Sequence, residues 1–254
     1  MSAAAGQQRR RGPRRALTED EILDAALTLL DHGGPDAASV RGIAARVGVA
    51  PNAVYTYFPG KAAVFQALAE RLLGEVDHDA FADRERPWCE RVQALALELR
   101  ERLSAHPGAV GLMVSSRMDG ANALALHERL LQLLADAGLD PIEAARASRL
   151  FFVYVFGSIV LEVAGAQQTG PLPAEAERVA TRLGTFSATP AGRFPQSAAA
   201  ATTMAHYIST EQYLWGLDRV LDGITTRITG VPKRRESRGS PKGQNPNGDG
   251  SVHP

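Results

Sequence analysis

The chain has 254 residues, with 28 basic and 28 acidic side chains, and 44% of its residues are hydrophobic. This composition is typical of a globular protein with a core of its own, and it excludes a collagenous or wholly disordered chain. The single cysteine, Cys89, excludes an intrachain disulfide and a thiolate zinc cluster. The longest apolar run, from Leu150 to Leu161, is shorter than the roughly 20 residues of a membrane span. We therefore expect a buried helix there and no membrane partner.

The zero net charge hides an uneven distribution along the chain. Residues 1–15 carry five arginines and no acid, residues 62–230 carry 15 basic and 20 acidic side chains, and residues 231–254 carry five basic and two acidic ones. A basic end on an acidic body is compatible with an N-terminal part that binds a polyanion, although basic arms are often only solvated. We expect residues 1–15 to form a basic, disordered arm, and the polar, Gly- and Pro-rich residues 231–254 a disordered tail.

The periodicity of the apolar residues predicts helices throughout, and no convincing run alternates with a period of two. Thr18 and Glu21 have the spacing of a capping box, Ser39 can cap the second helix, and the run His32-Gly33-Gly34-Pro35 ends the first. The expected helices of the N-terminal part span residues 18–30, 39–47, 51–57 and 61–81.

The remaining chain is also predicted to be helical, with one long exception. Asp140 and Glu143 again have the spacing of a capping box, with proline at the first helical position. Residues 168–205 are rich in Gly, Pro, Ser, Thr and Ala and are predicted to be a loop that holds at most one short helix, near residues 174–183. The expected helices span residues 87–105, 109–118, 122–137, 141–167 and 207–228.

The segment from Ser39 to Phe58 has the spacing of two helices joined by a tight turn. Ala44 is small where a second helix would cross, Gly48 can take the left-handed conformation of the turn, and Val54 is apolar where the second helix faces the first. This is the helix-turn-helix pattern, whose second helix can enter the major groove of DNA.

An alternative interpretation is a three-helix packing unit that touches no nucleic acid. Three features favour DNA binding: the five arginines of residues 1–15, the aromatic pair Tyr55 and Tyr57, and Lys61 at the start of a helix. A lysine beside free backbone amides is suited to binding a phosphate.

Residues 14–72 resemble the N-terminal domain of TetR-family transcriptional regulators. The resemblance lies in Ile43-Ala44-x-x-Val47-Gly48-Val49, in Val54-Tyr55-x-Tyr57-Phe58, and in Lys61. It implies an all-α homodimer in which the third helix of each subunit reads one operator half-site. The implied domains are a helix-turn-helix DNA-binding domain over residues 16–62 and a larger helical regulatory and dimerisation domain over residues 63–230.

The same resemblance implies which residues contact double-stranded operator DNA. The positions that contact bases in the family correspond to Arg41, Pro51, Asn52, Ala53 and Thr56, and those that contact phosphates correspond to Ser39, Tyr55, Tyr57 and Lys61. Asn52 is suited to adenine, because its amide can donate and accept a hydrogen bond, and Arg41 is suited to guanine.

The C-terminal part resembles the regulatory domain of the tetracycline repressors. Met113 stands where their metal-binding histidine falls, and Asp77 and Leu95 stand at two of their polar drug-contacting positions, although a shift of one residue would bring His78 to the place of Asp77. Because a thioether is a poor ligand for Mg²⁺, we expect no metal, no cofactor and no sensing of a tetracycline–magnesium complex.

The sequence instead favours an apolar cavity between helices of the regulatory domain. The candidate lining residues are Leu95, Leu99, Met113, Arg117, Phe152, Phe156 and Glu162, and the alternative is that they are ordinary core. Glu162 lies inside an apolar helix, where a carboxylate is costly unless it is paired. It faces water, binds an arginine such as Arg149, Arg117 or Arg219, or meets a ligand.

The sequence does not support a catalytic function, because it contains no Walker-type, dinucleotide-binding, zinc-protease or nucleophile-elbow motif. We expect a cytoplasmic, nucleoid-associated homodimer, joined through the helices at 141–167 and 207–228 and released from a palindromic operator by a small hydrophobic effector. An activator or architectural protein without an effector remains an alternative. So does a helical interaction protein or enzyme with a vestigial DNA-binding part.

Overall fold

The computed structural model describes residues 17–79, 83–164 and 170–228. Every regular element within these ranges is a helix, which confirms the predicted all-α class. The basic arm expected at residues 1–15 and the tail expected at 231–254 lie outside the described residues.

The N-terminal head consists of α1 (Glu19–Ala37), α2 (Val40–Val47) and α3 (Pro51–Tyr55). The capping box is confirmed, because Thr18 Oγ1 accepts from Glu21 N at 3.2 Å and Thr18 N donates to the Glu21 carboxylate at 3.1 Å. Ser39 Oγ caps α2 through Gly42 N, and Gly48 ends it with φ +74°. These local bonds fix the turn that sets α3 across α2.

The first and third helices differ from the prediction at their C-terminal ends. The regular part of α1 runs a few residues past residue 30 and is interrupted, as predicted, within the run His32-Gly33-Gly34-Pro35: Gly34 has non-helical angles, with φ +68°, and the element as a whole extends to Ala37. Glycine adopts this angle without the steric cost of a side chain, so one further helical turn follows the kink. Helix α3 ends at Tyr55 rather than at residue 57.

Helix α4 (Lys61–Gly74) leads from the head into the regulatory domain and packs along α1 and α7. The expected continuation to residue 81 is wrong. Gly74 lies against Asn122 of α7, where a Cβ would be 2.5 Å from the amide nitrogen, and beyond it Asp77 N donates to Glu98 of α5. These contacts with α5 and α7 turn the chain away from the axis of α4.

The regulatory domain is built around α8 (Pro141–Ala164), which packs against α5, α6, α7 and α12. Its length and hydropathy would suffice for a membrane span, but nine of its residues are buried within this bundle. The surrounding elements are α5 (Trp88–Ala105), the short 3-10 helix η2 (Pro107–Ala109), α6 (Val110–Ser115), α7 (Ala121–Asp136) and α12 (Thr210–Ile228). The Asp140 side chain caps α8 as predicted, accepting from Ile142 N and Glu143 N.

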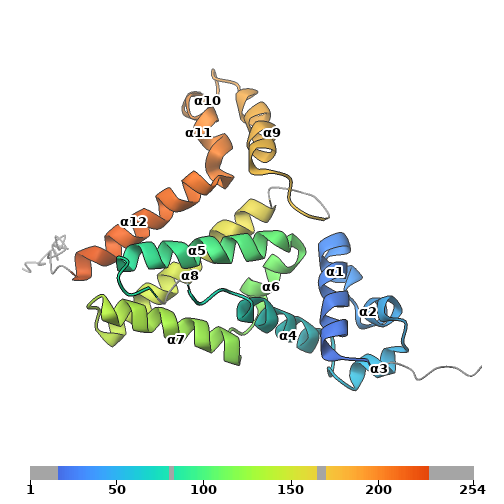
Figure 1. Ribbon diagram of the computed structural model, residues 1–254. Helices are drawn as coiled ribbons and strands as arrows, with labels where there is room; N and C mark the ends of the chain where they lie inside the picture. Colours follow the sequence, from blue (N-terminus) through green and yellow to red (C-terminus); the bar gives the residue numbers. More distant parts are fainter. Residues whose placement is uncertain (1–16, 80–82, 165–169, 229–254) are drawn as a thin grey trace, which may run out of the picture.

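The short helix allowed near residues 174–183 is present, but the rest of the expected loop at residues 168–205 is wrong, because most of this segment is helical. It contains α9 (Glu175–Ser187), α10 (Pro195–Ala199) and α11 (Ala201–Ala205), followed by the 3-10 helix η3 (His206–Ile208). Helices α9 and α11 pack on each other and project from the bundle at the top of Figure 1. No residue of α9 or α10 is fully buried, although Val179, Leu183 and Phe186 recur at helical spacing along α9 and are half-buried.

The head meets the regulatory domain most closely at Gly108 of η2. A Cβ on this residue would lie 2.2 Å from the backbone oxygen of Leu30 in α1. We predict that Gly108→Ala lowers the free energy of unfolding by about 1–3 kcal/mol, because two backbones must separate to admit the methyl group. Gly111→Ala is the matched control, since a Cβ there meets nothing within 4 Å.

Thermal and chemical unfolding of both variants measures the difference. The Gly111 variant is expected to be unchanged or stabilised by up to about 1 kcal/mol. Equal stability of the two variants would contradict the close approach of η2 to α1.

Candidate nucleic-acid interface and ligand cavity

Helix α3 presents a polar face to solvent and an apolar face to the head. Val54 is fully buried, whereas Asn52 and Thr56 are exposed and Tyr55 is 52% exposed. Of the other residues expected to contact bases, Arg41 and Pro51 are exposed and Ala53 is half-buried. Four of the five residues expected to contact bases are thus accessible to solvent, and the buried Val54 anchors α3 to the head.

Three of the four expected phosphate contacts already have bonds inside the head. Ser39 caps α2, Tyr57 Oη donates to the backbone oxygen of Leu17, and Lys61 Nζ donates to Pro35 O at 2.5 Å. Tyr55 has no such bond among the described residues. Ser39 therefore stabilises the start of α2, and Tyr57 and Lys61 are bonded to residues near the two ends of α1.

The described part of the head is not basic. Residues 17–61 contain three basic side chains (Arg41, Arg46 and Lys61) and six acidic ones, four of which lie between residues 19 and 24 of α1. The five arginines of residues 1–15 reverse this balance. Electrostatic attraction to a polyanion must therefore come largely from the arm that precedes α1.

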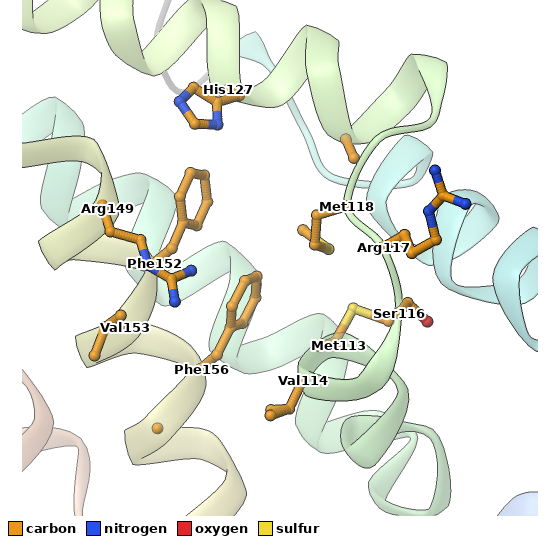
Figure 2. Close-up of a pocket in the computed structure, with 12 residues that line it drawn as sticks. Met113, Val114, Ser116, Arg117, Met118, His127, Arg149, Phe152, Val153 and Phe156 are labelled. Carbon is orange, nitrogen blue, oxygen red and sulfur yellow. The ribbon is translucent and has the colours of Figure 1, made fainter. Parts of the chain in front are cut away.

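A cavity of about 580 Å³ lies between α6, α7 and α8. Phe152 and Phe156 of α8 face Met113 and Met118 across it, and His127 of α7 lies at one end (Figure 2). The two phenyl rings are stacked, with centroids 5.6 Å apart. This volume lies within the range of small-molecule sites.

The structure brings together four of the seven residues expected to line a cavity. Met113, Arg117, Phe152 and Phe156 line it, although the Arg117 guanidinium is largely exposed and paired with Asp119. Leu95 and Leu99 do not, because they lie on the fully buried side of α5. Glu162 lies elsewhere, two helical turns after Phe156.

Sequence reasoning missed Arg149 and His127 as lining residues. Arg149 precedes Phe152 by three residues and Phe156 by seven, so it shares their face of α8, and this spacing could have identified it. No ion pair within residues 17–79, 83–164 and 170–228 engages Arg149. Among the described residues the lining carries two arginines and no carboxylate.

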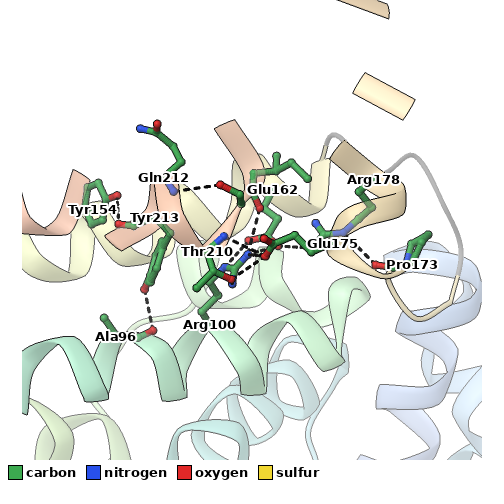
Figure 3. Close-up of polar contacts among 12 residues, drawn as sticks. Ala96, Arg100, Tyr154, Glu162, Pro173, Glu175, Arg178, Thr210, Gln212 and Tyr213 are labelled. Carbon is green, nitrogen blue, oxygen red and sulfur yellow. Dashed lines mark hydrogen bonds and ion pairs between the residues drawn. The ribbon is translucent and has the colours of Figure 1, made fainter. Parts of the chain in front are cut away.

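Glu162 is the centre of a buried ionic cluster (Figure 3). Its carboxylate is 5% exposed and accepts two bonds from Arg100, at 2.9 and 3.0 Å, and one from Arg178, at 2.8 Å. Arg100 also donates to Glu175 and to Thr210 Oγ1. The suggested partners Arg149, Arg117 and Arg219 are wrong: the first two lie at the cavity and the third pairs with Asp222. These bonds connect α9 and α12 to α5 and α8.

The bonds in the cluster shift the pKa values of two of its members, Arg100 and Glu175. Burial lowers the pKa of the Arg100 guanidinium, but its bonds to Glu162 and Glu175 raise it above the ordinary value overall. Burial raises the pKa of Glu175, yet the bonds from Thr210 and Arg100 leave it below the ordinary value. The lowered pKa of Glu175 stabilises the folded chain at pH values above the pKa that this group has in the unfolded state. This stabilisation is lost as the pH falls through the pKa of the folded state.

An apolar stripe on α8 and α12 is left uncovered in the single chain. Leu150, Val153 and Leu161 project from α8, and Trp215 projects from α12. Leu161 is 73% exposed and Trp215 is 58% exposed, and both line a groove that η3 and α11 border. These are the two helices expected to form the dimer interface, and their exposed faces are suited to a second apolar surface.

Two family models match the chain and together cover almost all of the described residues. Bacterial regulatory proteins of the tetR family match residues 22–68, and the tetracyclin repressor-like C-terminal domain matches residues 81–228. An HTH-type transcriptional regulator of Saccharopolyspora erythraea is 32% identical over 78% of this chain and 83% of its own length. The HTH-type transcriptional repressor DrrR1 of Streptomyces coeruleorubidus is 26% identical over 91% of this chain and 85% of its own length.

Solved structures have the same fold. A possible TetR family regulator of Streptomyces coelicolor A3(2) is 29% identical, with a TM-score of 0.72 over 83% of this chain and all of the other. ActR of Streptomyces coelicolor, solved in complex with actinorhodin, is 23% identical, with a TM-score of 0.68 over 84% of this chain and 98% of its own. The C-terminal family model alone covers more than half of the 254 residues. The chain belongs to the TetR family of transcriptional regulators.

Proposed function

We propose that the protein is a cytoplasmic, homodimeric repressor that binds a palindromic operator through α3 and is released by a small, largely apolar effector. The observation that carries this proposal is the exposed polar face of α3 in a chain whose regulatory helices surround an apolar cavity. Members of the family are dimeric, ligand-responsive repressors. The effector acts by binding better to a conformation in which the two heads no longer fit the operator.

DNA recognition is divided between α3 and the arm. Asn52, Thr56 and Arg41 are exposed and reach base edges, whereas Tyr55 contacts a phosphate. Lys61 and Tyr57 meet phosphates only by sharing or exchanging their bonds to Pro35 and Leu17. Since the described head is acidic overall, the arginines of residues 1–15 supply most of the salt-dependent attraction.

We predict that Asn52→Ala reduces discrimination at one base pair by about 1–3 kcal/mol, because the variant loses a paired amide contact to the base. Tyr55→Ala is the matched comparison on the same helix and is expected to weaken all sequences alike. The measurement is selection of duplexes from a random library by the purified protein, followed by affinities at several salt concentrations. An Asn52 variant with the wild-type specificity profile would contradict the assignment.

The cavity favours a flat, largely apolar effector that carries an acidic group. Its walls are the phenyl rings of Phe152 and Phe156 and the thioethers of Met113 and Met118, and its charged lining is cationic. Actinorhodin, the ligand named for the structural relative ActR, is the first compound to titrate. Arg149 is placed to pair with an acidic group of the effector, because no carboxylate of the described chain neutralises it.

We predict that Arg149→Met weakens binding of the fluorescent aromatic sulfonate anilinonaphthalene sulfonate about tenfold, through loss of one ionic contact at the solvent-exposed edge of the cavity. Arg146→Met is the matched control, because Arg146 lies one turn earlier on α8, is exposed and pairs with Glu143. Fluorescence titration measures both affinities. Equal affinities for the two variants would remove Arg149 from the site.

Dimerisation uses the uncovered stripe of α8 and α12. Two helices from each subunit make a four-helix interface, which places two heads at the spacing that a palindromic operator requires. Val153 lies on this stripe and also lines the cavity, so the cavity borders the interface.

We predict that Leu161→Asp weakens the dimer at least about tenfold, because it places a charge in an apolar contact. Leu124→Asp is the control, since Leu124 is an exposed leucine on α7, away from the stripe. Analytical ultracentrifugation over a concentration series measures both variants. A Leu161 variant that dimerises like the Leu124 variant would place the interface elsewhere.

A further inference from the structure

We infer that two carboxylates, Asp31 of α1 and Glu70 of α4, are positioning residues that join the head and the connecting helix α4 to two different walls of the cavity and so transmit occupancy of the cavity to the DNA-binding face. This inference rests on the proposed function. Both residues lie outside the base-reading face and outside the cavity.

The first joint connects α1 to the start of the segment that carries α6. Asp31 Oδ1 accepts from Gly108 N of η2 at 3.1 Å, and Asp31 Oδ2 is 2.9 Å from His106 Nδ1. The backbone oxygen of Asp31 also accepts from Gly170 N at 2.6 Å. The Asp31 side chain is 13% exposed, so water competes little for these bonds. No side chain of the regulatory domain caps η2, and Asp31 supplies the missing acceptor.

The second joint connects α4 to the start of α7. Glu70 Oε2 accepts from Asn122 N at 2.8 Å, Oε1 accepts from Ala123 N at 3.4 Å, and the Asn122 amide donates back to Glu70 O at 2.9 Å. The residue before α7 is Gly120, which has no capping side chain, and a Cβ there would lie 2.1 Å from the Glu70 carboxyl carbon. The glycine makes room for a carboxylate from α4 to act as the cap.

The two helices held in this way line different sides of the cavity. Helix α6 contributes Met113 and Val114, and α7 contributes Ala123 and His127. Between them, the backbone of Arg117 donates to Gln66 of α4 at 3.2 Å. A ligand that changes the spacing of α6 and α7 therefore changes the spacing of the two points at which the head is attached.

The head cannot follow both walls independently, because α1 and α4 are fixed to each other. Arg71 of α4 pairs with Asp24 of α1 at 2.7 Å, and Lys61 of α4 donates to Pro35 of α1. A change in the separation of α6 and α7 must therefore rotate the head or break one of the joints. Either outcome moves α3 relative to its operator half-site.

The test measures how firmly the head is held, and it needs neither DNA nor ligand. Ala45 on α2 and Glu128 on α7 are exposed, so cysteines at these positions in a Cys89→Ser background can carry two spin labels. The doubly labelled full-length chain is diluted into excess unlabelled chain, and pulsed electron paramagnetic resonance gives the distribution of label-to-label distances within one subunit. The variants are Asp31→Ala, Glu70→Ala and the double variant. Asp36→Ala is the control, because it removes an exposed acid from the same helix as Asp31.

We expect a narrow distribution in the wild-type chain and in Asp36→Ala, a broader one in each single variant, and the broadest in the double variant. Asp31→Asn and Glu70→Gln retain an acceptor oxygen and are expected to recover most of the narrow distribution, while circular dichroism confirms that every variant is folded. A double variant with the wild-type width would overturn the inference.

A second measurement separates this inference from the proposed function. The double variant is expected to bind a duplex selected by the wild-type protein about tenfold more weakly than Asp36→Ala does, because a loosely held head must be ordered on binding. If the double variant has a broadened distance distribution but binds the duplex as tightly as Asp36→Ala does, the two joints do not transmit occupancy of the cavity to the DNA-binding face. If the wild-type chain selects no duplex, the proposed function fails, and the distance distributions still decide whether the joints hold the head.

Discussion

The structure depends on backbone amides at the starts of η2 and α7 that find their acceptors on α1 of the head and on α4, the helix that leads out of the head. Gly108 N donates to Asp31, and Asn122 N donates to Glu70. Exposed helix starts have free donors in any fold, and they are ordinarily capped by the residue that precedes the helix. Because the caps come here from α1 and α4, the segments that lead into α6 and α7 are bonded to the head and to the helix that carries it. The same two helices line the cavity.

A second buried polar site stabilises the far end of the molecule. Glu162 is paired with Arg100 and Arg178, and this cluster is the deepest contact of α9 with the bundle. Replacing one member would leave an uncompensated buried charge, which typically costs about 3–5 kcal/mol. The stripe of α8 and α12 that we assign to the dimer lies next to this cluster, since Leu161 precedes Glu162 and Thr210 begins α12. The charge cluster and the apolar stripe thus lie side by side, and together they involve α8, α9 and α12.

The sequence predicted those parts of the structure that are decided locally. The caps at Thr18, Ser39 and Asp140 lie within three residues of the amides they bind, and Gly48 closes its turn with its own backbone angle. Of the projecting helices, α9 was expected as one short helix near residues 174–183, whereas α10 and α11 were missed, because each has five residues and packs on α9 and on the other. The composition of a short segment does not show which other segment it will pack against.

The same distinction separates the site residues that were found from those that were missed. Phe152 and Phe156 were predicted from a face of α8, and Arg149 could have been added from the same spacing. The partners of Glu162 lie 62 and 16 residues away, and no spacing rule connects them. Leu95 and Leu99 were assigned to the cavity because an apolar face does not reveal whether it borders a void or a neighbouring helix. The two joints are pairings between distant segments and were likewise invisible in the sequence.

The central claim is that the DNA-binding face and the walls of the cavity are energetically linked through Asp31 and Glu70. Amide hydrogen exchange at Gly108 and Asn122, measured with and without a duplex selected from random DNA, tests it most directly. The account predicts that the duplex slows exchange at both amides as well as in α3, because DNA binding selects the conformation in which both joints are closed. Protection confined to α1, α2 and α3, with unchanged exchange at Gly108 and Asn122, would contradict it.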